Sequence, residues 1–387
     1  MAAPPLDDGG AAETDDGASS GENDALLGPA EGRAHPPEDE GGWRRTMRRR
    51  VLESGEAAMF VATFIYALQG YVAKVVERNV PAIQVVFVRS ILSGTLTVLT
   101  GLHSNRVAWG AAAPRERLAM LVGKPEHARL LLLRGLCGAI AFNITYAALP
   151  YLPLADHTAL FFLNPIFIAL GSWPILGETV GAIDVLGVAM GFAGTLLDVR
   201  PSFIFGGETS PRFLKGVYLQ LAAAVLAAGA MLCVRYIGKR ESPLVIAAWF
   251  QGMSCLTSAV LLLPPWSTAM GQSPIVPSAH DAALLGLVSC TSYAAQILLN
   301  RGYQVLPPVK ASGIAYLQVV WSALLGAVAL GEALTFTSVM GALLICGGGF
   351  VSAVYRATRK KAADAPVPPK MQELVPTNAT AAPSPAV

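Results

Sequence analysis

The stretch that decides the fold occurs twice. Residues 153–178 read PLADHTALFFLNPIFIALGSWPILGE, and residues 307–332 read PPVKASGIAYLQVVWSALLGAVALGE. At this constant offset the two strings share their first proline and their closing Leu-Gly-Glu, and they align without a gap as far as residues 195 and 349. A fixed period this long indicates a duplicated module of several helices.

Both copies belong to a strongly apolar chain. Of its 387 residues, 53% are hydrophobic and only 14% are charged, which is typical of an integral membrane protein. A membrane helix needs about 20 mostly apolar residues. The segments that qualify lie near residues 57–76, 81–102, 129–149, 153–175, 180–198, 214–234, 243–263, 282–301, 309–330 and 336–355. The predicted fold is therefore all-α and integral to the membrane, with ten transmembrane helices.

These spans form two repeats of five helices, at 55–198 and 214–356, joined by a loop at 199–213. We expect residues 1–54, acidic and then basic, and residues 357–387 to be disordered tails, because they contain little apolar surface to bury. An odd number of helices per repeat makes the second copy cross the membrane in the opposite sense. The repeats are therefore predicted to be inverted, an arrangement that places a binding site near the bilayer midplane.

Orientation follows from the Lys and Arg residues in the short connections. If the amino end is cytosolic, that side receives nineteen of these residues and the opposite side receives five. Both termini of this multi-pass chain are thus predicted to be cytosolic. The sequence does not distinguish the plasma membrane from an internal membrane.

The first copy, from Pro153 through Asn164-Pro165 to Glu178, resembles the EamA domains of the drug/metabolite transporter superfamily. Arg134-Gly135 and residues 146–149 (Tyr-Ala-Ala-Leu), at the two ends of the third span, are similar to the solute carrier family 35 G-type branch. The resemblance covers residues 55–356. It implies a ten-helix carrier whose central cavity is lined by the first four helices of each half.

The second copy departs from this pattern. Lys310 takes the place of Asp156, and Gln318-Val319 takes the place of Asn164-Pro165. The two halves are therefore not expected to contact a solute equivalently.

Arg89 is the leading candidate for solute binding because it lies about 12 Å into its span, at about 1.5 Å per residue. An unpaired charge at that depth costs about 2.5 to 3.5 kcal/mol. Arg89 binds an anionic group of the solute, pairs with Asp156 or Asp184, or extends to the membrane surface. The other basic residues near span ends, Arg134 among them, are interpreted as interfacial anchors. Further solute-binding candidates are Asn143, Tyr146, Asn164, Asn300, Tyr316, Gln318 and Trp321.

Three residues are predicted to have structural roles. Pro165 should interrupt the fourth span and displace the carbonyl group of Phe161, either as a packing kink or to expose polar groups to a cavity. Glu178 and Glu332 should complement the positive amino ends of the helices that follow them.

Two further features suggest partners. Residues 187–191 and 347–349 of the fifth and tenth spans carry small-residue surfaces, which suit either a homodimer or packing within the monomer. Leu26-Leu27, preceded by acidic residues, resembles a dileucine signal read by sorting adaptors, although so short a motif often occurs by chance.

The combined interpretation is a secondary transporter that moves a small polar organic solute by alternating access, with an anionic metabolite preferred. Two alternatives remain: a non-transporting membrane scaffold or regulatory protein, and a lipid or ion pathway of the same fold. The sequence contains neither a P-loop nor a His-Glu-x-x-His motif, and its five cysteines form no close-spaced pair. No enzyme activity, cofactor, metal site or nucleic-acid partner is expected.

Overall fold

The computed structural model describes residues 54–104, 119–148, 151–206, 210–269, 271, 273–330 and 335–363. Within these residues every regular element is a helix. The predicted sorting motif at Leu26-Leu27, Glu332 and most of both tails lie outside the described residues.

Nine helical spans in the described part of the chain are long and apolar enough to cross a membrane, which confirms an all-α membrane protein. A further apolar helix, Phe336–Ser352, is shorter. The nine spans are α2 (Gly55–Val76), α3 (Ala82–Ser104), α6 (Ala128–Ala148), α7 (Leu154–Phe161) with α8 (Asn164–Leu176), α9 (Ala182–Val199), α11 (Pro211–Ile237), α12 (Pro243–Leu262), α14 (Ala279–Val305), and α15 (Pro308–Ala315) with α16 (Leu317–Leu330). The shorter apolar helix is the first part of α17 (Phe336–Ala363). Short helices occupy the connections: η1 (Pro125–His127), α10 (Ser202–Phe205), η3 (Gly238–Arg240) and α13 (Trp266–Ala269).

Helix α17 is longer than expected. The predicted repeat ended at residue 356, but the helix continues to Ala363 and includes the first residues of the expected disordered tail. These added residues are Ala, Thr, Arg and Lys, which have adequate helix propensity and extend a helix that is already nucleated.

Serine residues start the first helix of each repeat. The Ser54 hydroxyl accepts a hydrogen bond from the Ala57 N–H at 3.3 Å, and the Ser210 hydroxyl accepts one from the Phe213 N–H at 3.2 Å. Each bond satisfies an amide that the helix itself leaves unpaired. Capping chemistry thus repeats along with the hydrophobic pattern.

The fourth span is interrupted where the proline predicted a break: α7 ends at Phe161 and α8 starts at Asn164 with Pro165 in its first turn. The ninth span is interrupted at Tyr316 without a proline. The Tyr316 hydroxyl donates to the Phe162 carbonyl oxygen at 3.1 Å, and the two rings stack 5.9 Å apart. Phe162 and Tyr316 are equivalent positions of the two copies, so the two interrupted spans contact each other at equivalent residues.

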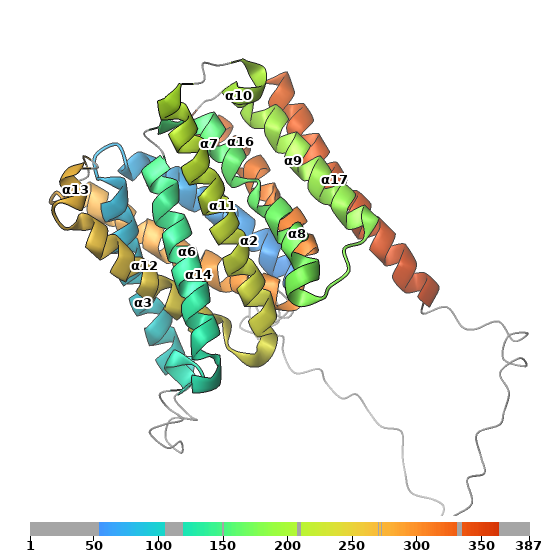
Figure 1. Cartoon of the computed structure of the whole chain (residues 1–387), viewed down its shortest axis with the longest axis horizontal. Coiled ribbons are helices and arrows are strands. Elements are labelled where there is room, and N and C mark those ends of the chain that lie inside the picture. The colour runs from blue at the N-terminus through green and yellow to red at the C-terminus, as the bar shows by residue number, and fades with distance from the viewer. Residues whose placement is uncertain are drawn as a thin grey trace, which may run out of the picture. The chain divides into compact units, whose positions relative to one another are not determined.

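The two repeats run in opposite directions. A β-carbon on Gly187 of α9 would lie 2.6 Å from Ser352 Oγ of α17, whereas one on Gly194 would lie 2.5 Å from the Gly341 carbonyl oxygen. Advancing along α9 therefore means going back along α17, and Figure 1 shows the two helices side by side and antiparallel. The small-residue surfaces of the fifth and tenth spans are used in this contact within the monomer. A homodimer through these helices stays a prediction.

Helices pack mainly on partners from the other repeat. These contacts occur in pairs that the duplication relates. The α2–α14 contact corresponds to α11–α6, the α3–α14 contact to α12–α6, and the α2–α16 contact to α11–α8. We call α2, α3, α14, α15 and α16 the first bundle, and α6, α7, α8, α11 and α12 the second bundle. The bundles meet through α3 against α12 and α8 against α15. Each bundle thus combines helices of both repeats.

The α9–α17 contact gives a test of this packing. Gly194→Ala should destabilise the protein by about 1 to 3 kcal/mol, because its β-carbon would overlap the Gly341 backbone, which cannot rotate away. Gly286→Ala on α14 is the matched control, since a β-carbon there meets no atom within 4 Å. Thermal unfolding of the purified protein in detergent would measure both. Equal melting temperatures for the two variants would contradict the close approach.

Candidate functional site

A cavity of about 220 Å³ lies between the two bundles. The first four spans of each repeat line it, as the family resemblance implied. Its described walls are Tyr66, Arg89, Arg134, Gly138, Ala141, Phe142, Phe161, Phe162, Asn164, Pro165, Ala227, Ala230, Met231, Phe250, Gln296, Leu299, Tyr303, Ala315 and Gln318. Two arginines are the charged members of this set, and no acidic residue accompanies them.

Arg89 of α3 is buried, with 3% of its surface exposed, so its side chain does not extend to the membrane surface. Nη1 donates to Ser292 Oγ at 3.3 Å, and the guanidinium lies over the Phe142 ring, 4.2 Å from the centroid. Nε and Nη2 have no hydrogen-bond partner. Among the described residues Arg89 makes no ion pair, so the alternative of a pair with Asp156 or Asp184 is wrong.

Asp156 is occupied elsewhere. Its carboxylate accepts hydrogen bonds from the Ser202 hydroxyl and, at 3.4 Å, from the Phe203 N–H. These donors lie in α10, directly after α9, so Asp156 fixes the connection between the repeats.

Arg134 of α6 is the second cavity arginine, and its sequence interpretation as an interfacial anchor is wrong. It is 1% exposed, with its guanidinium 5.0 Å from the centroid of the Phe250 ring. Nη2 lies 3.4 Å from Asn300 Oδ1, while Nε and Nη1 have no partner. Gly138, one turn further along, leaves room for this group, because a β-carbon there would lie 2.5 Å from Nη1.

A sequence signal for Arg134 does exist. Arg134, Gly138 and Phe142 follow one another at four-residue spacing, which places them on one face of a helix. All three line the cavity. Distance from the end of a span says how deep a residue lies, but only such a face pattern says whether it points inward.

Neutral polar groups complete the cavity wall. The Tyr66 hydroxyl donates to Gln296 Oε1 at 2.6 Å, and Gln296 Nε2 donates to Asn300 Oδ1 at 3.3 Å. Asn300 continues the chain to the Pro243 carbonyl oxygen at 3.4 Å. Asn164 Oδ1, at the start of α8, is buried without a partner. Tyr66 and Gln296 were not among the sequence candidates, although polar residues recur along one face of α14.

The eight predicted solute-binding residues are distributed unequally. Arg89, Asn164 and Gln318 line the cavity, and Asn300 contacts Arg134 from behind. The other four contact neighbouring helices outside the cavity lining: Asn143 donates to Thr257, Tyr146 lies close to Glu77, Tyr316 bonds the Phe162 carbonyl oxygen, and Trp321 packs edge-on against Phe60 and Phe64. Solute binding by any of them stays a prediction.

On the side where α2 begins, which we call the amino side, both bundles share one apolar cluster. Met59, Tyr303 and Leu306 of the first bundle meet Leu131 and Ile246 of the second. This cluster separates the cavity from the amino side.

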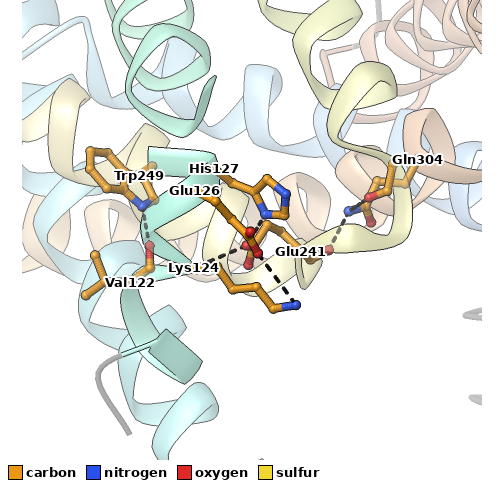
Figure 2. A network of polar contacts seen from close by, with 8 residues as sticks. Val122, Lys124, Glu126, His127, Glu241, Trp249 and Gln304 are labelled. Carbon is orange, nitrogen blue, oxygen red and sulfur yellow. Dashed lines mark hydrogen bonds and ion pairs between the residues drawn. The ribbon is translucent and has the colours of Figure 1, made fainter. Parts of the chain in front are cut away.

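Polar contacts also gather on the amino side, and those of Gln304 reinforce the closure between the bundles (Figure 2). The Glu241 carboxylate accepts from the Lys124 N–H at 3.0 Å and contacts His127 Nδ1 at 2.6 Å, which joins the α11–α12 connection to the start of α6. Gln304, at the end of α14, donates to the Gly238 carbonyl oxygen at 2.6 Å and to that of Glu241 at 2.8 Å. The Gln304 bonds cross from the first bundle to the second.

Glu178 also acts on the amino side, in a different way from the one expected. It precedes Gly181, the N-cap of α9, and so lies outside that helix's first turn. Instead it pairs with Arg235 Nε at 2.7 Å, and Arg235 Nη1 donates to the Gln304 carbonyl oxygen at 3.2 Å. The connection between α8 and α9 lets Glu178 reach α11 in place of the helix end.

On the far side the apolar clusters stay within single bundles. Val76, Val85 and Leu285 belong to the first bundle, whereas Leu160 and Phe213 belong to the second. Glu77, after α2, lies close to Tyr146 of α6 in the other bundle. Burial raises the pKa of the Glu77 carboxyl to about 7, and the nearby Tyr146 hydroxyl opposes this shift.

Comparison with known proteins identifies related chains. The model of the EamA-like transporter family matches residues 53–199 and 214–354. Solute carrier family 35 member G1 of Homo sapiens is 25% identical over 60% of this chain and 64% of its own length; its Mus musculus counterpart is 29% identical over 47% and 50%. The chain therefore spans between half and two thirds of these two relatives. The pseudopaline exporter CntI of Pseudomonas aeruginosa (strain UCBPP-PA14) is 26% identical over 77% of this chain and 93% of its own length.

A solved crystal structure has the same fold. It superposes with a TM-score of 0.63 at 19% identity and covers 78% of this chain and 96% of that chain. At this level of identity the likeness concerns the fold alone.

The unpaired state of Arg89 affects stability. Arg89→Met removes a buried charge, which costs the parent protein about 2.5 to 3.5 kcal/mol. It also removes cation–π contacts, which stabilise the parent by about 2 kcal/mol. We expect the variant to be about 1 kcal/mol more stable than the parent in thermal unfolding. Arg235→Met, which breaks the ion pair with Glu178, is the control and should be less stable. Equal destabilisation by both changes would make Arg89 a structural residue.

Proposed function

Because this chain belongs to the EamA-like transporter family, we propose that it is a secondary transporter that carries a small organic anion across its membrane by alternating access. Transport itself agrees with the printed functions of its relatives, which are named as a solute carrier and an exporter. The anionic solute and the mechanism rest on the residues of the cavity.

The observation that supports an anion is the pair of buried guanidinium groups. Arg89 and Arg134 together keep four nitrogen atoms without hydrogen-bond partners, in a cavity whose lining contains no acid. Buried charges in proteins are normally paired, and a guanidinium fork matches the two oxygens of a carboxylate or phosphate group. A bound anion would supply the missing partners of both side chains.

The volume and the lining of the cavity restrict the class of solute that it can bind. The cavity volume of about 220 Å³ is smaller than the roughly 300 to 1,000 Å³ of sites for drug-sized ligands, which favours a small metabolite. Phe250 lies within 6 Å of both guanidinium groups, so an apolar surface faces the space between the charges. Asn164 and Gln318 add neutral hydrogen-bonding groups to the wall.

The two arginines belong to different bundles, and this gives the anion a mechanical role. Arg89 lies on α3 of the first bundle and Arg134 on α6 of the second. Without an anion, like charges face each other across the cavity; with one, both bundles bind the same group. Loading therefore favours an occluded state in which the bundles approach, as alternating access requires.

Access to the two sides would alternate through the contacts between bundles. In the present structure the shared apolar cluster and the Gln304 bonds close the amino side. Opening that side requires these contacts to break. Glu77, close to Tyr146 of the other bundle, is positioned to become hydrated when the far side opens.

Uptake into proteoliposomes tests the anion site. We expect Arg89→Gln and Arg134→Gln each to lower uptake of the accepted solute by about 10- to 100-fold, since a hydrogen bond to a charged group contributes about 1.5 to 3 kcal/mol. Arg129→Gln, on the same helix as Arg134 but near its start and away from the cavity lining, should leave uptake unchanged. The panel would contain radiolabelled mono-, di- and tricarboxylates and phosphate monoesters.

Competition by neutral analogues provides the second measurement. Amides and alcohols of the accepted solute should inhibit far more weakly than the anions, by about tenfold or more. Equal inhibition would remove the arginines from solute binding, and the absence of any flux across the panel would favour a scaffold role.

Glu77 predicts a pH dependence of far-side opening. In this structure burial holds the Glu77 pKa at about 7; opening of the far side hydrates the carboxyl and returns its pKa toward 4.5. The closed form therefore holds a proton that the open form releases. Raising the pH from about 5 to about 7 should favour opening by less than about tenfold per pH unit, and the effect should level off above about pH 7.

Two spin labels would report the opening, one at Arg78→Cys in the first bundle and one at Tyr218→Cys in the second, in a background without other cysteines. Opening of the far side should increase the distance between the two labels. Glu77→Gln should abolish the pH dependence. Glu126→Gln, an exposed acid on the amino side, is the control and should preserve it. An unchanged pH profile in Glu77→Gln would exclude this carboxyl as the titrating group.

A further inference from the structure

A second cavity, of about 550 Å³, lies away from the candidate solute site. It is a groove between α2 and α15 of the first bundle and the peripheral α9–α17 pair, which Figure 1 shows at the edge of the helices. The walls are mostly apolar and include Phe60, Val61, Val188, Ile314, Leu317 and Ile345. The groove and the arginine cavity share no lining residue, so the occupant of the groove is independent of the proposed solute.

The polarity of the groove changes along its length. Its charged residues are Glu56, Asp184 and Lys310, each in the first turn of its helix, α2, α9 and α15. These three helices all begin on the amino side, because Lys310 pairs with Glu56 and Asp184 borders the same groove. The charges therefore lie together at one end, at the level where membrane helices begin.

The apolar part extends inward from that end. Leu317 follows Lys310 by seven residues, so the groove reaches about 10 Å into the span, at about 1.5 Å per residue. Half of the hydrocarbon core is about 15 Å thick. A charged mouth at the surface and an apolar wall beneath it match the shape and polarity of a membrane amphiphile.

Glycines keep the groove open. A β-carbon on Gly313 of α15 or on Gly349 of α17 would meet no atom within 4 Å, although both residues border the groove. By contrast, Gly187 of α9 and Gly348 of α17 pack in direct contact with each other. All four glycines border the groove, but only Gly313 and Gly349 leave room for a side chain to enter it.

We propose that this groove binds a zwitterionic phospholipid from the surrounding bilayer. Its phosphate would lie at Lys310, its ammonium group near Glu56 and Asp184, and one acyl chain along Phe60, Ile314 and Leu317. The charges of the mouth favour this class of headgroup, because two carboxylates and one ammonium oppose a net negative lipid but complement a headgroup that carries both signs. The apolar wall would bury the chain and remove its CH₂ groups from contact with polar surroundings.

Groove-filling variants provide the test. Gly313→Leu places a side chain in the groove from a position where a β-carbon meets no atom within 4 Å. It should reduce co-purified phosphatidylethanolamine or phosphatidylcholine by about tenfold or more, measured by native mass spectrometry. Gly252→Leu is the matched control: this glycine of α12 is exposed and also has no atom within 4 Å. It should retain lipid as the parent does. Gly349→Leu fills the same groove from α17 and replaces Gly313→Leu if that variant fails to fold.

Three results would overturn the proposal. The first is full lipid retention by the groove-filling variants. The second is tighter binding of phosphatidylglycerol than of the two zwitterionic lipids when each is added to delipidated protein. The third is loss of a dimer, measured by light scattering, from the groove-filling variants with lipid retention unchanged, which would assign the groove to a second copy of the chain.

Discussion

The central constraint on this protein is that two positive charges lie inside a membrane bundle without acids to balance them in the described cavity lining. Arg89 and Arg134 are buried, and each keeps two nitrogen atoms unpartnered. The protein reduces this cost with aromatic rings, since Phe142 and Phe250 offer the negative faces of their π systems to the guanidinium groups. Such contacts lower the cost of the charges without neutralising them. The remaining deficit is the observation on which the proposed anionic solute rests.

Interlocking of the two repeats determines where these charges lie. Both arginines come from the first repeat, yet the exchange of helices between repeats places Arg89 in the first bundle and Arg134 in the second. If each repeat packed on itself, both charges would move as one body, and an anion between them could not link the moving parts. The contact between the equivalent residues Phe162 and Tyr316 shows that the backbone keeps the symmetry of the two repeats. The charged side chains of the cavity do not keep it, because both arginines come from the first repeat.

The sequence predicted the features that depend on the length of the apolar segments and on the number of helices in each repeat. Ten spans followed from apolar runs, and inversion followed from an odd number of helices per repeat. The described helices show nine such spans and one shorter apolar helix at the position of the tenth, and the antiparallel α9 and α17 agree with the inversion. Arg89 was recognised because a charge at mid-span is costly wherever it points. Arg134 was misread because a position near a span end fits both an anchor and a buried residue, and only its neighbours across the bundle distinguish the two.

The remaining differences arise from contacts between residues distant in sequence. Glu178 turns from the expected helix end to Arg235, and Asp156 bonds the connection after α9; neither partner is indicated by a local pattern. The ninth span is interrupted at Tyr316 without a proline, and the Tyr316 hydroxyl bonds the Phe162 carbonyl at the break in the other interrupted span. Polarity alone singled out Asn143 and Trp321, but their partners, Thr257 and the Phe60 ring, lie on adjacent helices outside the cavity lining.

The peripheral α9–α17 pair brings these constraints together. It contacts α15 and α16 of the first bundle and α7 and α8 of the second, so it must accommodate any movement between them. A tightly packed interface resists such movement, because separating well-fitted side chains leaves voids that cost free energy. The glycine-lined groove avoids that cost on the α2 side: a flexible acyl chain can change shape as the walls move. Close packing along α9 and α17, and a deformable filling between this pair and α2, would together let the bundles rock while the periphery stays intact.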